Sequence, residues 1–163
     1  MWGSSGVEAN YNLCFGGLAL FSEYCYLGKE CTDDGVFDVS EALTGDTKEF
    51  TDALSDLALG YDGAVKAGNG AFYGDVLLPT VYYDFDYEVM KSTYKKSIDT
   101  LDKYTHHKYY EFYRTFFEIC YKKADIYLNL RNSYKSGNKL YIKNVSECVI
   151  PELINLYRKF CKI

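Results

Sequence analysis

The sequence predicts an all-α protein, folded as an antiparallel bundle of helices. Apolar residues recur at three- and four-residue spacings along most of the chain, which is the spacing of one face of a helix. Only two prolines occur among 163 residues, so little interrupts long helices. After residue 5 the one run with strand character is VLLPTVYY, and Pro79 weakens that assignment because proline cannot donate to a sheet.

The first expected helix covers residues 7–27. Its apolar stripe consists of Val7, Tyr11, Cys14, Leu18, Phe21 and Cys25. Ser4 or Ser5 can serve as the N-cap, because a serine oxygen accepts a free amide hydrogen of the first turn. Gly28 can end the helix, since glycine takes the left-handed conformation at little cost.

The middle of the chain is expected to be less regular. Thr32 or Asp33 can cap a short helix that Gly45 ends, and a further helix is expected from Asp46 to about Leu59. Residues 60–80 contain five glycines and a proline, which interrupt any period. We therefore expect a loop there.

The second half of the chain is strongly helical in its pattern. We expect two long helices, near 84–105 and 108–135, with a break at two adjacent histidines and with Gly137 ending the second helix. A last helix runs to Phe160 with its apolar stripe from Leu140 onward. Pro151 lies inside it and should kink or restart it.

The bulk composition excludes some classes of partner. The formal net charge is −5, so we expect no nucleic-acid partner. The longest apolar runs are far too short to cross a bilayer, and no membrane partner is expected. No signal peptide pattern begins the chain. Together with its cysteines, these features favour a cytoplasmic location.

Six cysteines are present, and their spacing suggests neither a metal nor a disulfide framework. They are Cys14, Cys25, Cys31, Cys120, Cys148 and Cys161. None form a C-x-x-C pair, and no histidine lies at zinc-finger spacing from them. Several lie on apolar stripes, where free cysteine behaves as a small buried hydrophobe. We expect reduced core thiols, no metal and no cofactor.

Two further groups of polar residues have structural interpretations. The acidic cluster of Asp84, Asp86 and Glu88 is expected to be the first turn of a long helix, where acids complement the helix dipole. The adjacent His106 and His107 would diverge by about 100° on a helix and could not face one metal. We expect them to be exposed residues at a helix end.

Several longer stretches resemble one enzyme family. MWGSSGVEAN followed by LALFSEYCYLGKECTDDGVF resembles the end of the catalytic barrel of glycoside hydrolase family 20, the β-N-acetylhexosaminidases. The chain is most similar to the bacterial branch with a helical domain after the barrel. The resemblance continues through LSDLALG, AFYGDVLLP and VIPELINLYRKF, and so covers most of the chain.

The resemblance implies a division of the chain and two site residues. Residues 1–28 would be the last strand tip and the outer helix of a (β/α)8 barrel, with the upstream barrel packing on helix 7–27. Residues 29–163 would be a truncated C-terminal helical domain. Trp2 corresponds to the tryptophan that stacks on the N-acetylglucosamine ring. Ser4 stands where many members have an acidic residue that binds sugar hydroxyls.

The implied function is that of an exo-β-N-acetylhexosaminidase acting on terminal β-linked N-acetylglucosamine or N-acetylgalactosamine. Catalysis in the family is substrate-assisted, and the catalytic Asp-Glu pair would lie upstream of Met1. No catalytic residue is expected in this chain, which alone should be an inactive fragment with an exposed apolar patch near its N-terminal helix. The alternative is a free-standing helical-bundle interaction module without enzymatic activity.

Overall fold

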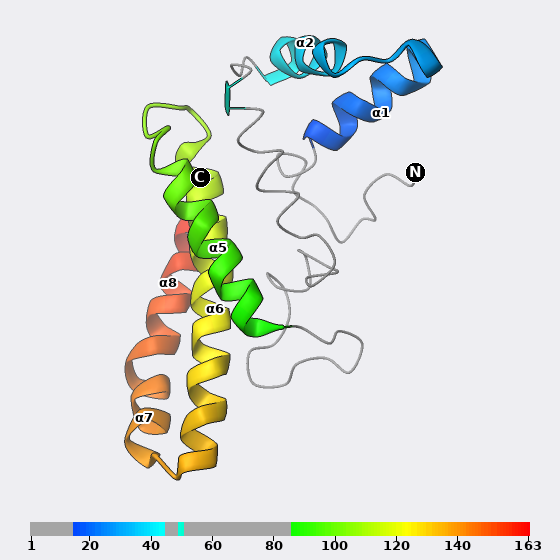
Figure 1. The fold of residues 1–163 in the computed structure, drawn as a ribbon. Helices are drawn as coiled ribbons and strands as arrows, with labels where there is room; N and C mark the ends of the chain where they lie inside the picture. The colour runs from blue at the N-terminus through cyan, green and yellow to red at the C-terminus, as the bar shows by residue number, and fades with distance from the viewer. Residues whose placement is uncertain (1–14, 45–48, 51–85) are drawn as a thin grey trace. The chain divides into compact units, whose positions relative to one another are not determined.

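The structure, a computed structural model, describes residues 15–44, 49–50 and 86–163 (Figure 1). The chain divides into two compact units, residues 1–59 and 60–163. Helices make up the regular structure of the described residues, and none of them lies in a strand. The prediction of an all-α fold is confirmed to that extent.

Residues 15–44 of the first unit form α1 (Phe15–Leu27), the 3-10 turn η2 (Gly28–Glu30) and α2 (Asp33–Thr44). The helices α1 and α2 pack on each other. Gly28 has a φ of 60°, so it ends α1 in the left-handed conformation as predicted. The Thr32 hydroxyl accepts the Gly35 amide hydrogen at 3.1 Å and caps α2. The predicted residues 7–14 and the predicted helix of 46–59 lie outside the described residues, apart from 49–50.

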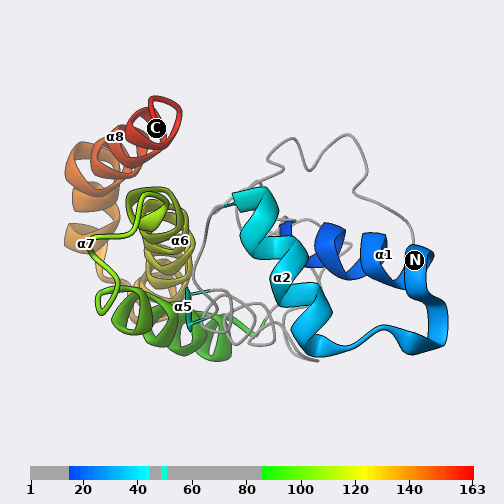
Figure 2. The same ribbon diagram turned by 90° about the horizontal axis from the view of Figure 1, so that it is seen from above.

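The second unit is a three-layered arrangement of helices. Its elements are α5 (Tyr87–Leu101), α6 (Tyr110–Ser136), α7 (Lys139–Asn144), a π-helical segment (Val145–Val149) and α8 (Ile150–Phe160). Both α5 and α8 pack on α6, which lies between them (Figure 1 and Figure 2). The two long predicted helices are confirmed within a few residues at each end. The predicted loop of 60–80 lies outside the described residues.

Side-chain and backbone caps fix the ends of the long helices. The Asp86 carboxylate accepts the amide hydrogens of Glu88 and Val89, both at 3.1 Å, and so begins α5. Gly137 has a φ of 69° and ends α6. The Asn138 amide donates to the Ser133 carbonyl at 2.8 Å, which completes a Schellman motif and turns the chain toward α7.

The connection between α5 and α6 reverses the chain without glycine or proline. The Tyr104 amide donates to the Leu101 carbonyl at 2.8 Å, and the His107 amide donates to the Tyr104 carbonyl at 2.9 Å. The Tyr110 amide then donates to the His107 carbonyl at 3.0 Å. Consecutive tight turns thus satisfy the backbone where the α-helical pattern stops, at the predicted break.

The π-helical segment explains how Pro151 is accommodated. Proline has no amide hydrogen, and its ring would collide with the carbonyl four residues back in a regular helix. The chain widens just before it, and the Ile150 amide donates to the carbonyl of Val145, five residues back. A regular helix then begins again as α8. The predicted restart at Pro151 is confirmed.

The core of the second unit forms on two sides of α6. Buried apolar residues are Met90, Tyr94, Ile98 and Leu101 on α5, Phe112, Tyr113, Phe116, Phe117, Ile119, Cys120, Ala124 and Ile126 on α6, and Val145 and Leu153 beyond it. The Phe117 ring lies 5.9 Å from that of Tyr94 on α5. The Phe112 ring lies 5.0 Å from that of Phe160 on α8. Aromatic side chains therefore join both outer helices to α6.

Two residues of the predicted last stripe are not in the core. Leu140 is 79% exposed, and Cys148 is also exposed. The prediction that Leu140 and Cys148 belong to the apolar stripe of the last helix is wrong. The π-helical segment inserts a residue into the helical repeat, so residues before and after it cannot share one α-helical stripe. The buried position is instead Val145, the first residue of the π-helical segment.

A matched pair of leucine substitutions tests this core. Leu101 is fully buried, so Leu101→Ala should lower the free energy of unfolding by about 2–5 kcal/mol through lost burial and a cavity. Leu140→Ala makes the same chemical change at an exposed site and should change it by less than about 0.5 kcal/mol. Urea denaturation followed by circular dichroism measures both. Equal effects would contradict the assigned core.

Candidate functional site

The two residues predicted to bind substrate, Trp2 and Ser4, lie outside the described residues. Their roles therefore stay predictions. The structure does describe α1, the helix that follows them in the chain, from Phe15 onward. It also describes the polar groups of the second unit, several of which lie close together.

The acidic cluster at the start of α5 has a structural role where it is described. Asp86 is the N-cap, and its carboxylate is occupied by two backbone amides. Glu88 lies in the first helical turn, where its charge complements the dipole. Asp84 lies outside the described residues. The structural interpretation of Asp86 and Glu88 is confirmed.

The adjacent histidines differ from each other. His106 is exposed as predicted, whereas His107 is half-buried. The His107 Nδ1 atom accepts the Tyr109 amide hydrogen at 3.2 Å, so this imidazole caps the start of α6. The prediction that both are exposed is wrong for His107, because its side chain replaces a backbone partner that the tight turn cannot supply.

The described cysteines are free thiols, but only one belongs to the core. Cys120 is fully buried, and burial raises the pKa of its thiol to about 12. Cys25, Cys148 and Cys161 are exposed and Cys31 is half-buried, so among the described cysteines the prediction of core thiols holds for Cys120 alone. Cys14 lies outside the described residues. Among the residues that the structure describes, no group of three or more potential metal ligands comes together.

A charged network holds the turn between α5 and α6. Asp102 accepts hydrogen bonds from the Tyr110 hydroxyl at 2.7 Å and from Arg114 Nε at 3.1 Å. Arg114 also donates to Glu118 at 2.7 Å. The Tyr110 hydrogen bond, with help from Arg114, lowers the pKa of Asp102. The ionised Asp102 carboxylate therefore stabilises the folded protein at neutral pH, and this stabilisation is lost as the pH falls through that lowered pKa.

Ion pairs also join α6 to its two neighbours. Lys91 on α5 lies 2.6 Å from Asp125 on α6. On the other side, Lys122 of α6 pairs with Glu152 of α8, and Lys159 of α8 lies 2.9 Å from Glu111. These partly exposed pairs fix the register of the helices more than they add stability.

An open groove of about 670 Å³ lies between the start of α6 and the end of α8. It is lined by Glu111, Asn155, Arg158, Lys159, Lys162 and Ile163. The Glu111 carboxylate is engaged by Lys159, so it is not poised as a general base. The groove offers positive charge, and we assign no reaction to it.

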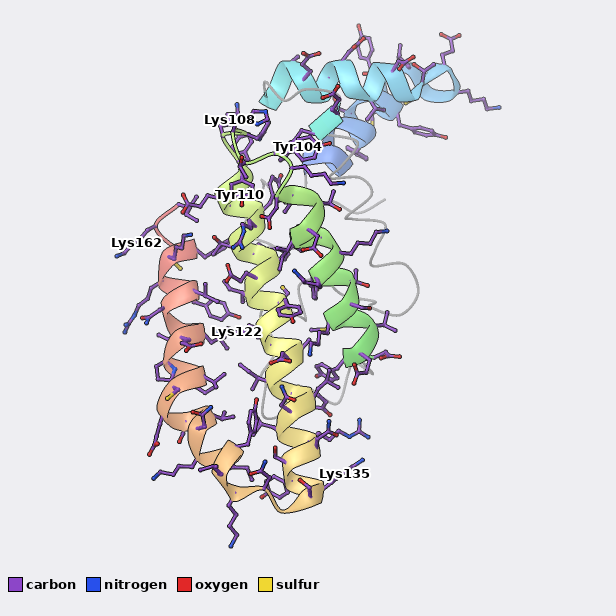
Figure 3. The ribbon with its side chains drawn as sticks, turned by 60° about the vertical axis from the view of Figure 1, so that its left-hand side comes forward. Tyr104, Lys108, Tyr110, Lys122, Lys135 and Lys162 are labelled. Atoms are coloured by element: carbon purple, nitrogen blue, oxygen red, sulfur yellow. The ribbon has the colours of Figure 1, made fainter. Side chains whose placement is uncertain are left out.

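Sequence reasoning missed a basic cluster at the opposite end of this unit, where α6 turns into α7. We call Arg131, Lys135, Lys139 and Lys143 the basic tip. No acidic residue occurs between positions 126 and 146, and that acid-free run is the signal that could have revealed it. Lys135 lies at this end of the helices in Figure 3.

Comparison with protein-family models, with curated proteins and with solved structures found no match to this chain. The described helices also include none that is long and apolar enough to cross a membrane.

The thiols provide a test of the assigned burial. Native protein treated with iodoacetamide at pH 8 should be alkylated at Cys148 and Cys161, which are exposed, and protected at Cys120, which is buried and has a raised pKa. Peptide mass spectrometry measures each site. Labelling in urea is the control and should remove the difference. Equal native labelling of Cys120 and Cys148 would contradict the core.

Proposed function

We propose that this chain is the C-terminal part of an exo-β-N-acetylhexosaminidase. The intact enzyme would remove terminal β-linked N-acetylglucosamine or N-acetylgalactosamine. The proposal starts from the resemblance of MWGSSGVEAN and the following helix to the end of the glycoside hydrolase family 20 barrel. It assigns α1 as the outer helix that follows the last barrel strand.

The observation that carries the proposal is the apolar surface of α1. Its sequence, FGGLALFSEYCYL, contains a single charged residue. A helix that is apolar on nearly all sides is normally buried by surrounding structure. Yet Phe21 is 46% exposed, Tyr24 is 61% exposed and Tyr26 is 88% exposed. Such a helix requires a partner, and a barrel preceding it in the chain would be one.

The stripe predicted to face the barrel supports the same assignment. Phe21 and Cys25 are the members of that stripe whose side chains the structure describes, and both are exposed. Each large apolar side chain left uncovered forgoes up to roughly 1.5–3 kcal/mol of burial. Covering α1 would therefore stabilise the whole protein appreciably against a typical net stability of about 5–15 kcal/mol.

The chemistry of the intact enzyme would come mainly from residues upstream of this chain. In the proposed mechanism a glutamic acid protonates the leaving oxygen, and the substrate's acetamido oxygen attacks the anomeric carbon while an aspartate orients it. Trp2 would supply the apolar face on which the sugar ring stacks. Ser4 would offer a hydroxyl to a sugar hydroxyl, a weaker contact than a carboxylate makes.

Enzyme kinetics test the proposed site. The 163-residue chain alone should not cleave an aryl N-acetyl-β-glucosaminide, whereas the longer protein containing the barrel should. In that protein Trp2→Ala should weaken transition-state binding by roughly 2–4 kcal/mol, measured as kcat/KM. Tyr134→Ala removes an exposed aromatic ring from the second unit and should leave kcat/KM unchanged. Unchanged kinetics for Trp2→Ala would remove that residue from the site.

The association state of the isolated 163-residue chain tests whether α1 needs a partner. We expect the 163-residue chain to self-associate and to bind a hydrophobic dye, because apolar side chains on α1 are uncovered. Phe21→Ser with Tyr24→Ser should reduce both effects, and Tyr134→Ser should not. Sedimentation velocity and dye fluorescence measure them. A monomeric wild-type chain that melts cooperatively and binds no dye would instead favour the independent helical interaction module.

A further inference from the structure

The basic tip belongs to the more basic part of the chain. Residues 86–163 contain 15 Lys and Arg against 9 Asp and Glu, whereas residues 1–85 contain 3 against 14. Arg131 and Lys135 are four residues apart on α6, and Lys139 and Lys143 are four apart on α7, so each pair lies on one helix face. The net charge of −5 conceals this separation.

The cations of the basic tip are largely uncompensated within the described part of the chain. All four are exposed. Lys143 lies 3.7 Å from Glu147, and both of these side chains are mostly exposed, so that pair is weak. Arg131, Lys135 and Lys139 make no ion pair among the described residues. The helix dipoles account for Lys135 in the last turn of α6 and for Lys143 in the last turn of α7, but not for Arg131 or Lys139.

Two large apolar side chains that alternate with these cations in the sequence are also exposed. Tyr134, in the last turn of α6, and Leu140, in the first turn of α7, are each 79% exposed. The Gly137 turn fixes the path of the chain between them through the Asn138 amide. The end of the helical hairpin therefore exposes two apolar side chains on the same helix ends that carry the four cations.

We propose that the basic tip, together with Tyr134 and Leu140, binds a membrane surface that contains anionic lipids. The lysines and Arg131 contact the headgroups, and the two apolar side chains enter the interface. Each cation near such a surface and each buried apolar group adds to the affinity. No membrane partner was expected from the sequence because nothing spans a bilayer, but a surface contact needs no spanning segment.

A lipid surface fits these residues better than a nucleic acid does. Nucleic acids would use the cations and could stack on Tyr134, but they gain little from a solvent-exposed leucine. A lipid interface accepts both kinds of group, because its headgroups attract lysine and its acyl boundary accepts tyrosine and leucine. The observation that selects lipid is the 79% exposure of Leu140, a leucine in the same hairpin end as four cations.

Vesicle flotation with the 163-residue chain tests the proposal, because vesicle-bound protein rises in a density gradient whereas self-associated protein sinks. We expect binding to vesicles of phosphatidylcholine with roughly one-third phosphatidylglycerol, weaker binding at high salt, and little binding to phosphatidylcholine alone. Lys135→Glu with Lys139→Glu should lower the partition coefficient at least about tenfold. Lys96→Glu with Lys103→Glu makes the same charge change at exposed sites outside the tip and should have less than about a threefold effect.

A second variant separates lipid insertion from simple attraction of polyanions. Leu140→Ser with Tyr134→Ser keeps the charge and should lower vesicle binding about fivefold or more. Unchanged far-ultraviolet circular dichroism confirms that the variants are folded. Equal vesicle binding by wild type and the Lys135/Lys139 variant would overturn the proposal and place binding elsewhere, such as on α1. Tight binding of a DNA duplex that is insensitive to the Leu140/Tyr134 variant would overturn it in favour of a polyanion surface.

Discussion

The burial of α6 on two opposite sides is the constraint on which the second unit depends. A helix with one neighbour needs one apolar stripe, whereas α6 has α5 on one side and α8 on the other. The buried residues of α6 therefore include some that would be exposed to solvent if the helix had a single apolar stripe. Examples are Tyr113 and Lys123, which is 6% exposed. The Lys123 ammonium reaches the Tyr157 hydroxyl at 3.3 Å, which keeps this charge hydrogen-bonded inside the interface.

The same arrangement places demands on the two ends of the unit. Because α5 and α8 both run back along α6, each connection must reverse the chain within a few residues. Asp102, Tyr110 and Arg114 hold one reversal with side-chain hydrogen bonds. At the other reversal the Gly137 and Asn138 amides donate to backbone carbonyls, and the Asn138 side chain accepts the Tyr141 amide hydrogen. These bonds use none of the cations of the basic tip, whereas the polar groups of the turn between α5 and α6 bind one another.

The spacing of apolar residues predicted the positions of the described helices well, but it predicted less well which side chains are buried. The stripe through Met90, Tyr94, Ile98 and Leu101 is buried as expected, because nothing disturbs its period. Leu140 could not be placed correctly, since the π-helical segment before Pro151 shifts the register and has no simple sequence signal. His107 caps a turn whose geometry depends on tertiary structure. The predicted site residue Trp2 lies outside the described residues, so its role stays a prediction.

Two exposed surfaces, one in each unit, differ in chemistry. The α1 surface is apolar with a single charged residue in the helix, which suits a dry protein interface, where an unpaired charge would be costly. The basic tip combines Tyr134 and Leu140 with four cations, which would not pack into a dry interface but suit a charged, hydrated boundary. The barrel proposed for α1 and the lipid surface proposed for the tip therefore do not compete for residues. A failure of either proposal would leave the physical grounds of the other unchanged.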